Sequence, residues 1–449
     1  MTTQKKNGNI VAIIAMFFLF AMISFVTNLA APIGNIWKNN YEWSGMLGNM
    51  MNFAAYLFMG IPAGKMLTKI GYKKTALIAM VVGLAGLILQ WLSGQVGAET
   101  GVFSVAGQVV TLNFIIYLLG AFVCGFCVCM LNTVVNPMLN LLGGGGNKGN
   151  QLVQMGGTLN SLAGTLTPLF VGVLIGVVTK ETSIGDVSPL LFIAMGVFIL
   201  AFLVISCVSI PEPNLGKGTK AVKYEHSAWS FRHTLLGVIG IFFYVGIEVG
   251  IPGVLIFWLA DPATGVVGGV ATAGAVAAVY WLLMLCGRFI SSIISGKVSS
   301  RTQLIVVSVV AILLTVGAIF MPQDITVNMP TYAAGGFVMA EVPVGALLLV
   351  LCGLCTSVMW GGIFNLAVEG LGKYTAQASG IFMMMVVGGG VMPLIQNAIA
   401  NSAGYLASYW LIVAMLAYLL YYGLIGSKNV NTDIPVEEEQ EAIAIEDAL

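Results

Sequence analysis

The sequence of 449 residues is 58% hydrophobic and only 8% charged, with a mean hydropathy of +0.97. That composition excludes an ordinary soluble domain, which must cover its core with more polar surface. The 18 basic and 18 acidic residues balance, and no basic cluster adjoins exposed aromatic residues, so nucleic acid is not an expected partner. The sequence has no paired acids, nucleophile–base pair, metal cluster or phosphate loop. Neither an enzyme nor a cofactor or metal is therefore expected.

Apolar runs recur along nearly the whole chain, each close to the roughly 20 residues that a helix needs to cross a bilayer. Glycines and prolines interrupt these runs without ending them, which membrane helices tolerate. The sequence therefore predicts an all-α membrane protein with about twelve transmembrane helices in two six-helix halves. The predicted spans are residues 9–31, 44–67, 74–93, 109–141, 151–179, 188–210, 234–260, 270–298, 302–321, 343–368, 374–400 and 403–426.

Lysines and arginines gather on one side of the membrane if these spans alternate in direction. They are Lys5, Lys6, Lys65, Lys69, Lys73, Lys74, Lys217, Lys220, Lys223, Arg232, Lys297, Arg301 and Lys373. The opposite loops hold only Lys38 and Lys180. Because basic loops stay in the cytoplasm, both chain ends are predicted to be cytoplasmic.

The longest polar interruption divides the spans six and six. The predicted units are an N-terminal half (1–210), a cytoplasmic central loop (211–233), a C-terminal half (234–426) and an acidic cytoplasmic tail (427–449). His226 and His233 fall in the central loop and are predicted to be solvated. The tail is predicted to be a solvated, disordered appendage because it is short and strongly acidic.

The two halves carry interrupted spans at corresponding places. The fifth span has Ala163-Gly164 shortly before Pro168, and the eleventh has three glycines, 388–390, before Pro393. Two similar halves with interrupted helices are typical of secondary transporters, which bind substrate near the middle of the membrane.

One span carries a carboxylate near its middle, at a cost of roughly 2.5–3.5 kcal/mol for insertion. This residue is Glu248, and Gly246, Gly250 and Pro252 lie around it. These neighbours indicate an interrupted helix that lines a cavity. Glu248 is therefore a candidate for ion coupling or substrate binding, and a buried acid paired only for structure is the alternative. The other embedded charge, Arg288, lies close to Lys297 and is expected to extend toward the cytoplasm.

Neutral amide and aromatic side chains also lie at membrane depth. They are Asn28 in the first span, Asn132 and Asn136 in the fourth, Asn160 in the fifth, Tyr244 in the seventh, and Trp360 and Asn365 in the tenth. Amides donate and accept hydrogen bonds, so several of them around a cavity suit a neutral polyhydroxylated ligand, on which aromatic rings can stack. The alternative is that these amides only join neighbouring helices.

Several short motifs, in order and across nearly the whole chain, resemble the major facilitator superfamily. Within it, the resemblance is to the fucose permease branch (the fucose–galactose–glucose:proton symporter family). The motifs are Phe17-Phe-Leu-Phe followed by Asn28, Leu131-Asn-Thr-Val-Val-Asn-Pro137, Thr158-Leu-Asn-Ser161, Phe243-Tyr-Val-Gly-Ile-Glu248, Gly287-Arg-Phe289, Ile363-Phe-Asn-Leu followed by Glu369-Gly-Leu-Gly-Lys, and Val387-Gly-Gly-Gly390.

The resemblance implies a major facilitator fold and a monosaccharide path through Asn160 and Trp360. It also reveals two departures from the family pattern. The family has an aspartate at the position of Asn28 and a glutamate at that of Asn132, and these carboxylates serve in proton coupling and sugar transport. Asparagine does not titrate. Glu248, where fucose permease has glutamine, is the carboxylate that remains clearly inside the spans.

The leading hypothesis is a transporter of a hexose or deoxyhexose in the bacterial cytoplasmic (inner) membrane. It is expected to work as a monomer in the lipid bilayer by alternating access. Coupling to H⁺ or to Na⁺ through Glu248, and uncoupled transport, remain open. Two other functions also remain open: a transport-inactive membrane sensor that binds sugar, and a transporter of a different small polar solute.

Overall fold

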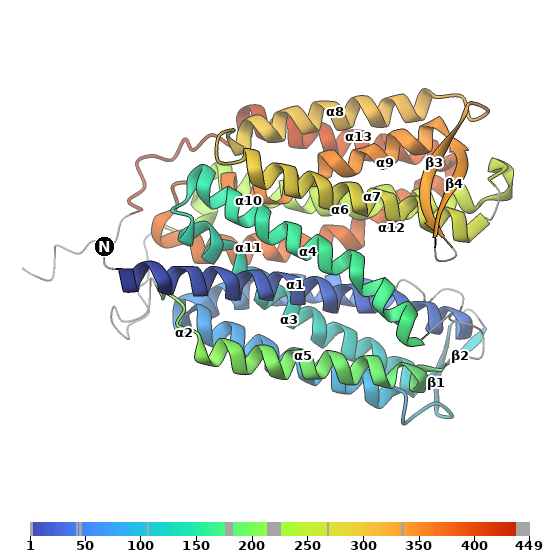
Figure 1. The fold of residues 1–449 in the computed structure, drawn as a ribbon, viewed down its shortest axis with the longest axis horizontal. Helices are drawn as coiled ribbons and strands as arrows, with labels where there is room; N and C mark the ends of the chain where they lie inside the picture. Colours follow the sequence, from blue (N-terminus) through green and yellow to red (C-terminus); the bar gives the residue numbers. More distant parts are fainter. Residues whose placement is uncertain are drawn as a thin grey trace, which may run out of the picture.

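The computed structural model describes residues 3–41, 44, 47–105, 107–175, 183–212, 226–266, 269–333 and 336–436. Long helices run side by side along its longest axis (Figure 1). The N-terminal elements are α1 (Thr3–Asn40), α2 (Leu47–Ser93), β1 (Gly101–Val105), β2 (Gln108–Thr111), α3 (Leu112–Leu142), α4 (Gly146–Ile175) and α5 (Ser188–Cys207). The C-terminal elements are α6 (Arg232–Ala260), α7 (Gly269–Ile294), α8 (Ser300–Phe320), β3 (Thr326–Ala333), β4 (Gly336–Pro343), α9 (Val344–Thr356), α10 (Met359–Val368), α11 (Thr375–Met384), α12 (Gly388–Ala403) and α13 (Tyr405–Tyr421).

Helix α2 contains two predicted spans, which join at Gly71 without a separate loop. Gly71 has a φ of 85°, a left-handed conformation that only glycine adopts readily. The backbone of Asn52 packs at Gly125 of α3, and the backbone of Gln90 packs at Gly120 of the same helix. A straight helix would separate Asn52 and Gln90 by about 57 Å, at about 1.5 Å per residue. The chain therefore turns back on itself at Gly71.

Two side chains of opposite charge fix this turn to the end of α5. The carboxylate of Glu212 accepts hydrogen bonds from the backbone N–H groups of Tyr72 and Lys73, at 2.7 and 2.8 Å. Lys73 in turn donates through Nζ to the carbonyls of Ser206 and Val208, at 2.7 and 2.8 Å. Each charge therefore binds unpaired backbone groups at the end of the other segment, where the helix dipole also favours it.

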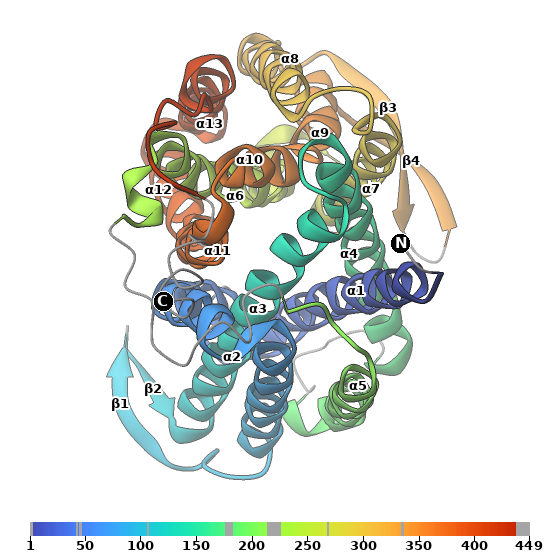
Figure 2. The ribbon, with the colours of Figure 1, turned by 90° about the vertical axis from the view of Figure 1, so that its left-hand side faces the viewer.

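The helices agree with the prediction of about twelve spans. Among the described residues, ten helical stretches are long and apolar enough to cross a membrane, and the one at Met50–Ser93 contains both spans of α2. Helix α4 supplies a further span of 30 residues, which is rich in glycine and amides. Breaks divide the tenth span into α9 and α10 and the eleventh into α11 and α12. In Figure 2 the blue-to-green helices lie mostly on one side of the bundle and the yellow-to-red helices on the other.

The all-α prediction missed two short β-hairpins at one end of the bundle (Figure 1). Strands β1 and β2 pair antiparallel, and so do β3 and β4, in which Thr326 pairs with Pro343. Residues 326–329 alternate polar and apolar side chains, but Pro330 interrupts the pattern, so the sequence did not distinguish a strand from a loop.

The prediction that His233 is solvated was wrong. His233 is fully buried in the first turn of α6, and its Nε2 lies 3.0 Å from the carbonyl oxygen of Glu369. The hydroxyl of Tyr422 donates to the His233 carbonyl at 3.2 Å. The reason is that α6 begins at Arg232, earlier than its apolar residues suggested, so His233 already belongs to the packed bundle.

The first part of the predicted tail is packed against the protein, contrary to the expectation of a solvated appendage. Asn431 accepts a hydrogen bond from the backbone of Arg232 at 2.9 Å through its side chain, and the carbonyl of Val436 accepts from the backbone of Lys373 at 3.1 Å. Ile434 is buried as well. The acidic residues 437–449, on which the prediction mainly rested, lie outside the described residues.

Glycines allow α2 and α11 to cross in close contact. A Cβ atom added at Gly380 would lie 2.6 Å from the carbonyl oxygen of Gly60 and 2.8 Å from the Cα of Gly64. Both neighbours are backbone atoms, which cannot rotate away as a side chain does. Small residues of this kind let membrane helices approach closely, and here they join the N-terminal and C-terminal helices.

We therefore expect Gly380→Val to lower the midpoint of thermal unfolding of the purified protein, because overpacking of a tight contact costs about 1–3 kcal/mol. Gly274→Ala is the control, since a Cβ at Gly274 meets no heavy atom within 4 Å. Thermal unfolding in detergent measures both variants. An unchanged midpoint for Gly380→Val would show that this crossing tolerates a side chain.

Candidate functional site

A buried ion pair joins α6 and α7 near the middle of the bundle. Arg288 Nη2 lies 3.1 Å from Glu248 Oε1, and the two side chains are 10% and 15% exposed. The expectation that Arg288 extends toward the cytoplasm was wrong, because the side chain turns inward to this carboxylate. A buried arginine needs an anionic partner and several acceptors, and the interior of the bundle supplies both.

The guanidinium of Arg288 also bonds to α4 and to the break between α9 and α10. Its Nη1 donates to Ser161 Oγ at 2.8 Å and to the Gly157 carbonyl at 3.2 Å. Its Nε donates to the Ser357 carbonyl at 3.3 Å. The hydroxyl of Tyr244 lies 3.5 Å from Nη2, at the limit of a hydrogen bond. One side chain thus links helices from both halves of the sequence.

Trp360 lies beside this pair and begins a chain of amide contacts. Its ring makes an edge contact with Tyr244, with ring centroids 6.2 Å apart, and its Nε1 donates to Asn136 Oδ1 at 3.0 Å. Asn136 Nδ2 donates to the Asn132 carbonyl at 2.8 Å. Asn132 Nδ2 donates to the Tyr56 hydroxyl at 2.9 Å. The amide of Asn136 therefore already bonds within the protein on both its oxygen and its nitrogen.

Two more of the predicted residues, Asn160 and Asn365, lie beside this group rather than in it. Asn160 donates to the carbonyl of Phe20 at 2.9 Å, and it directly precedes Ser161 on α4. Asn365 lies farther along α10, where it bonds to Asn140 and Ser300. Asn28 lies on α1, but its side chain is outside the described residues. The structure thus connects five of the eight predicted residues through a few contacts: Asn132, Asn136, Tyr244, Glu248 and Trp360.

Comparison with known proteins shows the family to which the chain belongs. The profile of the Major Facilitator Superfamily matches residues 12–391. The chain belongs to the Major Facilitator Superfamily. It is 30% identical over 440 residues to the glucose/galactose transporter of Brucella abortus biovar 1 (strain 9-941), with 95% of this chain and 97% of the relative covered. It is 22% identical to the L-fucose-proton symporter of Escherichia coli (strain K12), with 91% and 90% covered.

Solved structures show the same superfamily fold. A crystal structure of the E. coli fucose:proton symporter aligns with a TM-score of 0.75 at 18% identity, covering 94% of this chain and 100% of that one. The proton:xylose symporter aligns with a TM-score of 0.66 at 9% identity, covering 93% and 95%. The predicted major facilitator fold is thereby confirmed, and the protein is a multi-pass membrane protein.

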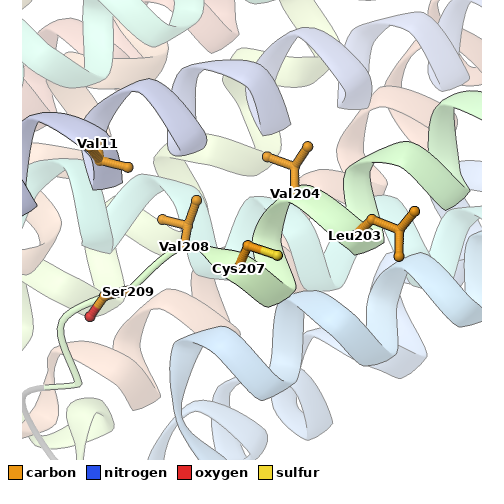
Figure 3. Close-up of a pocket in the computed structure, with 6 residues that line it drawn as sticks. All are labelled: Val11, Leu203, Val204, Cys207, Val208 and Ser209. Atoms are coloured by element: carbon orange, nitrogen blue, oxygen red, sulfur yellow. The ribbon is translucent and has the colours of Figure 1, made fainter.

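An open groove lies between α1 and α5, but it is not a suitable site for a sugar. Its lining residues are Val11, Leu203, Val204, Cys207, Val208 and Ser209 (Figure 3). Apart from one hydroxyl and one thiol, these side chains are apolar, so the groove lacks the donors and acceptors that a sugar requires. The polar groups that suit a sugar lie instead around Glu248 and Trp360.

Sequence reasoning missed several members of the polar network in this superfamily fold. Asn140, Gln154 and Ser300 lie at or near the predicted ends of spans, where polar residues are ordinary, so they were not singled out. The break at Ser357 and Val358 was not predicted either. The sequence signal for Asn140 and Gln154 is that each is an amide side chain just inside the end of a predicted span.

Proposed function

We propose that the protein is a secondary transporter that carries a monosaccharide of the hexose or deoxyhexose class across the bacterial inner membrane. The mechanism would be alternating access, with both chain ends in the cytoplasm and the single chain as the functional unit. The superfamily and the sugar-transporter names of its relatives support the substrate class. The distribution of basic residues supports the orientation.

The bonding of Arg288 to helices of both halves of the chain is the observation that carries this proposal most directly. It places a buried charge pair, two aromatic rings and several amides where helices of the two halves meet. A bound sugar in that region would touch both halves, as alternating access requires. We further propose that Glu248 carries the coupling to H⁺ or Na⁺, because Asn28 and Asn132 have no titratable group.

A counterflow screen of monosaccharides in proteoliposomes tests the proposal. The screen is repeated with an imposed pH gradient and with an imposed sodium gradient, so that sugar and driving ion are determined separately. Exchange of a hexose above the rate of empty liposomes is the expected result. Sugar binding without flux would instead favour a membrane sensor.

We expect Trp360→Ala and Asn160→Ala each to lower the apparent affinity for the transported sugar roughly 5- to 150-fold. The reason is that each loses a binding partner worth about 1–3 kcal/mol. Trp410→Ala is the matched control, because Trp410 is 47% exposed and contacts Phe320 rather than the site. Concentration-dependent uptake in proteoliposomes measures all three. Normal affinity in both site variants would place the sugar elsewhere.

A further inference from the structure

The open groove between α1 and α5 lies where both helices leave their apolar stretches (Figure 3). The apolar stretch of α1 begins at Ile10, and that of α5 ends at Cys207. Leu203 and Val204 lie inside the stretch of α5, whereas Ser209 lies beyond its end. The groove therefore crosses the level at which the hydrocarbon of a bilayer gives way to the head groups.

The groove is polar at one end and apolar at the other. Figure 3 shows the hydroxyl of Ser209 at one end of the row of lining residues and Leu203 at the other. On the side of Leu203 the exposed apolar surface continues with Ile14 on α1 and Leu200 on α5. The groove has a volume of about 550 Å³, within the roughly 300–1,000 Å³ of ligand pockets. This order, from a hydroxyl to a hydrocarbon surface, is that of a phospholipid in a bilayer.

A lysine lies at the polar end of the groove. Lys73 Nζ donates to the carbonyls of Ser206 and Val208 at 2.7 and 2.8 Å, and Val208 lines the groove. An ammonium group has three N–H donors, so these two bonds leave one for an anion. The carboxylate of Glu212 lies at the same turn, but it already accepts from the backbone N–H groups of Tyr72 and Lys73.

Further lysines lie around the same end. Lys74 follows Lys73 and is exposed, and Lys5 and Lys6 belong to the first turns of α1, before Val11. Basic residues beside membrane helices on the cytoplasmic side attract the head groups of anionic lipids. The charges at this end of the groove therefore complement a negatively charged head group.

We propose that this groove binds one anionic phospholipid of the cytoplasmic leaflet. One acyl chain lies between Val11 and Val204, and the phosphate lies at Lys73 and Ser209. A lipid fits better than a partner helix because the groove is continuous with lipid-facing surface and because a phosphate matches the remaining donor of Lys73. The inference uses the orientation proposed above, and it is independent of the sugar that is transported.

Photocrosslinking locates the lipid. The full chain is reconstituted in phosphatidylcholine liposomes that contain a small fraction of phosphatidylglycerol with a diazirine on its acyl chain, and mass spectrometry maps the adducts after illumination. We expect the adducts to concentrate at residues 11–14 and 203–209. Unlabelled phosphatidylglycerol should compete about fivefold better than unlabelled phosphatidylcholine, as the contribution of one lysine implies.

Two variants separate the acyl chain from the head group. Val204→Trp fills the groove, so we expect it to remove the adducts at residues 11–14. Leu313→Trp is its control, because Leu313 is exposed on α8, in the other half of the chain. Lys73→Gln should lower the preference for phosphatidylglycerol about fivefold. Lys428→Gln is its control, because Lys428 is an exposed lysine just after α13.

A second head-group variant is needed because Lys73 also fixes the end of α5. Lys5→Gln combined with Lys6→Gln leaves those bonds in place, and we expect it to lower the preference for phosphatidylglycerol as well. Native mass spectrometry of the detergent-purified protein is the second readout. The unmodified protein should retain one phosphatidylglycerol molecule more than Val204→Trp.

Equal competition by the two lipids, or unchanged adducts in Val204→Trp, would overturn the proposal. Adducts spread evenly over all exposed apolar faces would show ordinary lipid contact rather than a site. Crosslinks between two copies of the chain through these residues would assign the groove to a second copy instead.

None of these measurements needs a sugar, so their failure is distinguishable from failure of the transport proposal. Adducts in the groove without any hexose flux would retain the lipid site and reject the sugar. Hexose flux without such adducts would retain the transporter and reject the lipid site.

Discussion

The Glu248→Gln protein is expected to lose gradient-driven accumulation of sugar while keeping sugar exchange. Glutamine has nearly the shape of glutamate, and its amide oxygen can still accept the hydrogen bond that Arg288 Nη2 now donates to Oε1. What it cannot do is bind and release a proton or supply a full negative charge to a sodium ion. Accumulation against a gradient needs that ion movement, whereas exchange of sugar for sugar does not.

Proteoliposomes loaded with sugar measure exchange, and the same liposomes with an imposed pH or sodium gradient measure accumulation. Loss of only the sodium response would assign Glu248 to a sodium site, and a fall in sugar affinity with coupling intact would assign it to sugar binding. Glu341→Gln is the control, because Glu341 is an exposed acid on strand β4. Accumulation at the level of the unmodified protein in a well-folded Glu248→Gln variant would remove Glu248 from the coupling mechanism.

Arg288→Gln is expected to be the most damaging single substitution in the site. It leaves the Glu248 carboxylate buried without its cation, and loss of one member of a buried pair costs about 3–5 kcal/mol. It also removes the bonds to Ser161 and Gly157 that join α7 to α4. We expect a large fall in the thermal midpoint and no measurable uptake.

The double variant Arg288→Gln with Glu248→Gln separates the charge from the contacts. It leaves a neutral pair, so we expect it to unfold at a higher temperature than Arg288→Gln alone. Arg288→Lys keeps the charge but not the planar fork, and an intermediate midpoint is expected because lysine cannot reach acceptors on three helices at once. A double variant as unstable as the sum of the two single variants would contradict a charge-based role.

Much of the fold follows from patterns that lie within single segments. Each span needs only a run of apolar residues, and the insertion cost of one acid was enough to single out Glu248. The amides at 132 and 136 lie one turn apart, which also follows from helical spacing. The family motifs then indicated the superfamily.

The partners of these residues were less predictable, because they depend on how distant segments pack. Arg288 is 40 positions from Glu248 and 127 from Ser161, and no local pattern specifies either contact. The bond between Asn140 and Asn365 joins residues 225 positions apart. For the same reason, the buried position of His233 became apparent only once Glu369 and Tyr422 were placed around it.

The turn at Gly71 has a mechanical consequence. The two parts of α2 join without a flexible loop, so a rotation of one part is transmitted to the other. The bonds of Glu212 and Lys73 attach the end of α5 to the same turn. The two limbs of α2 and the end of α5 should therefore rotate together as a stiff lever, with little bending at the joint. Displacement at the crossing of α2 with α11 would then reach the outer surface at α5 almost undiminished, although no hydrogen bond among the described residues joins α5 to the polar site itself.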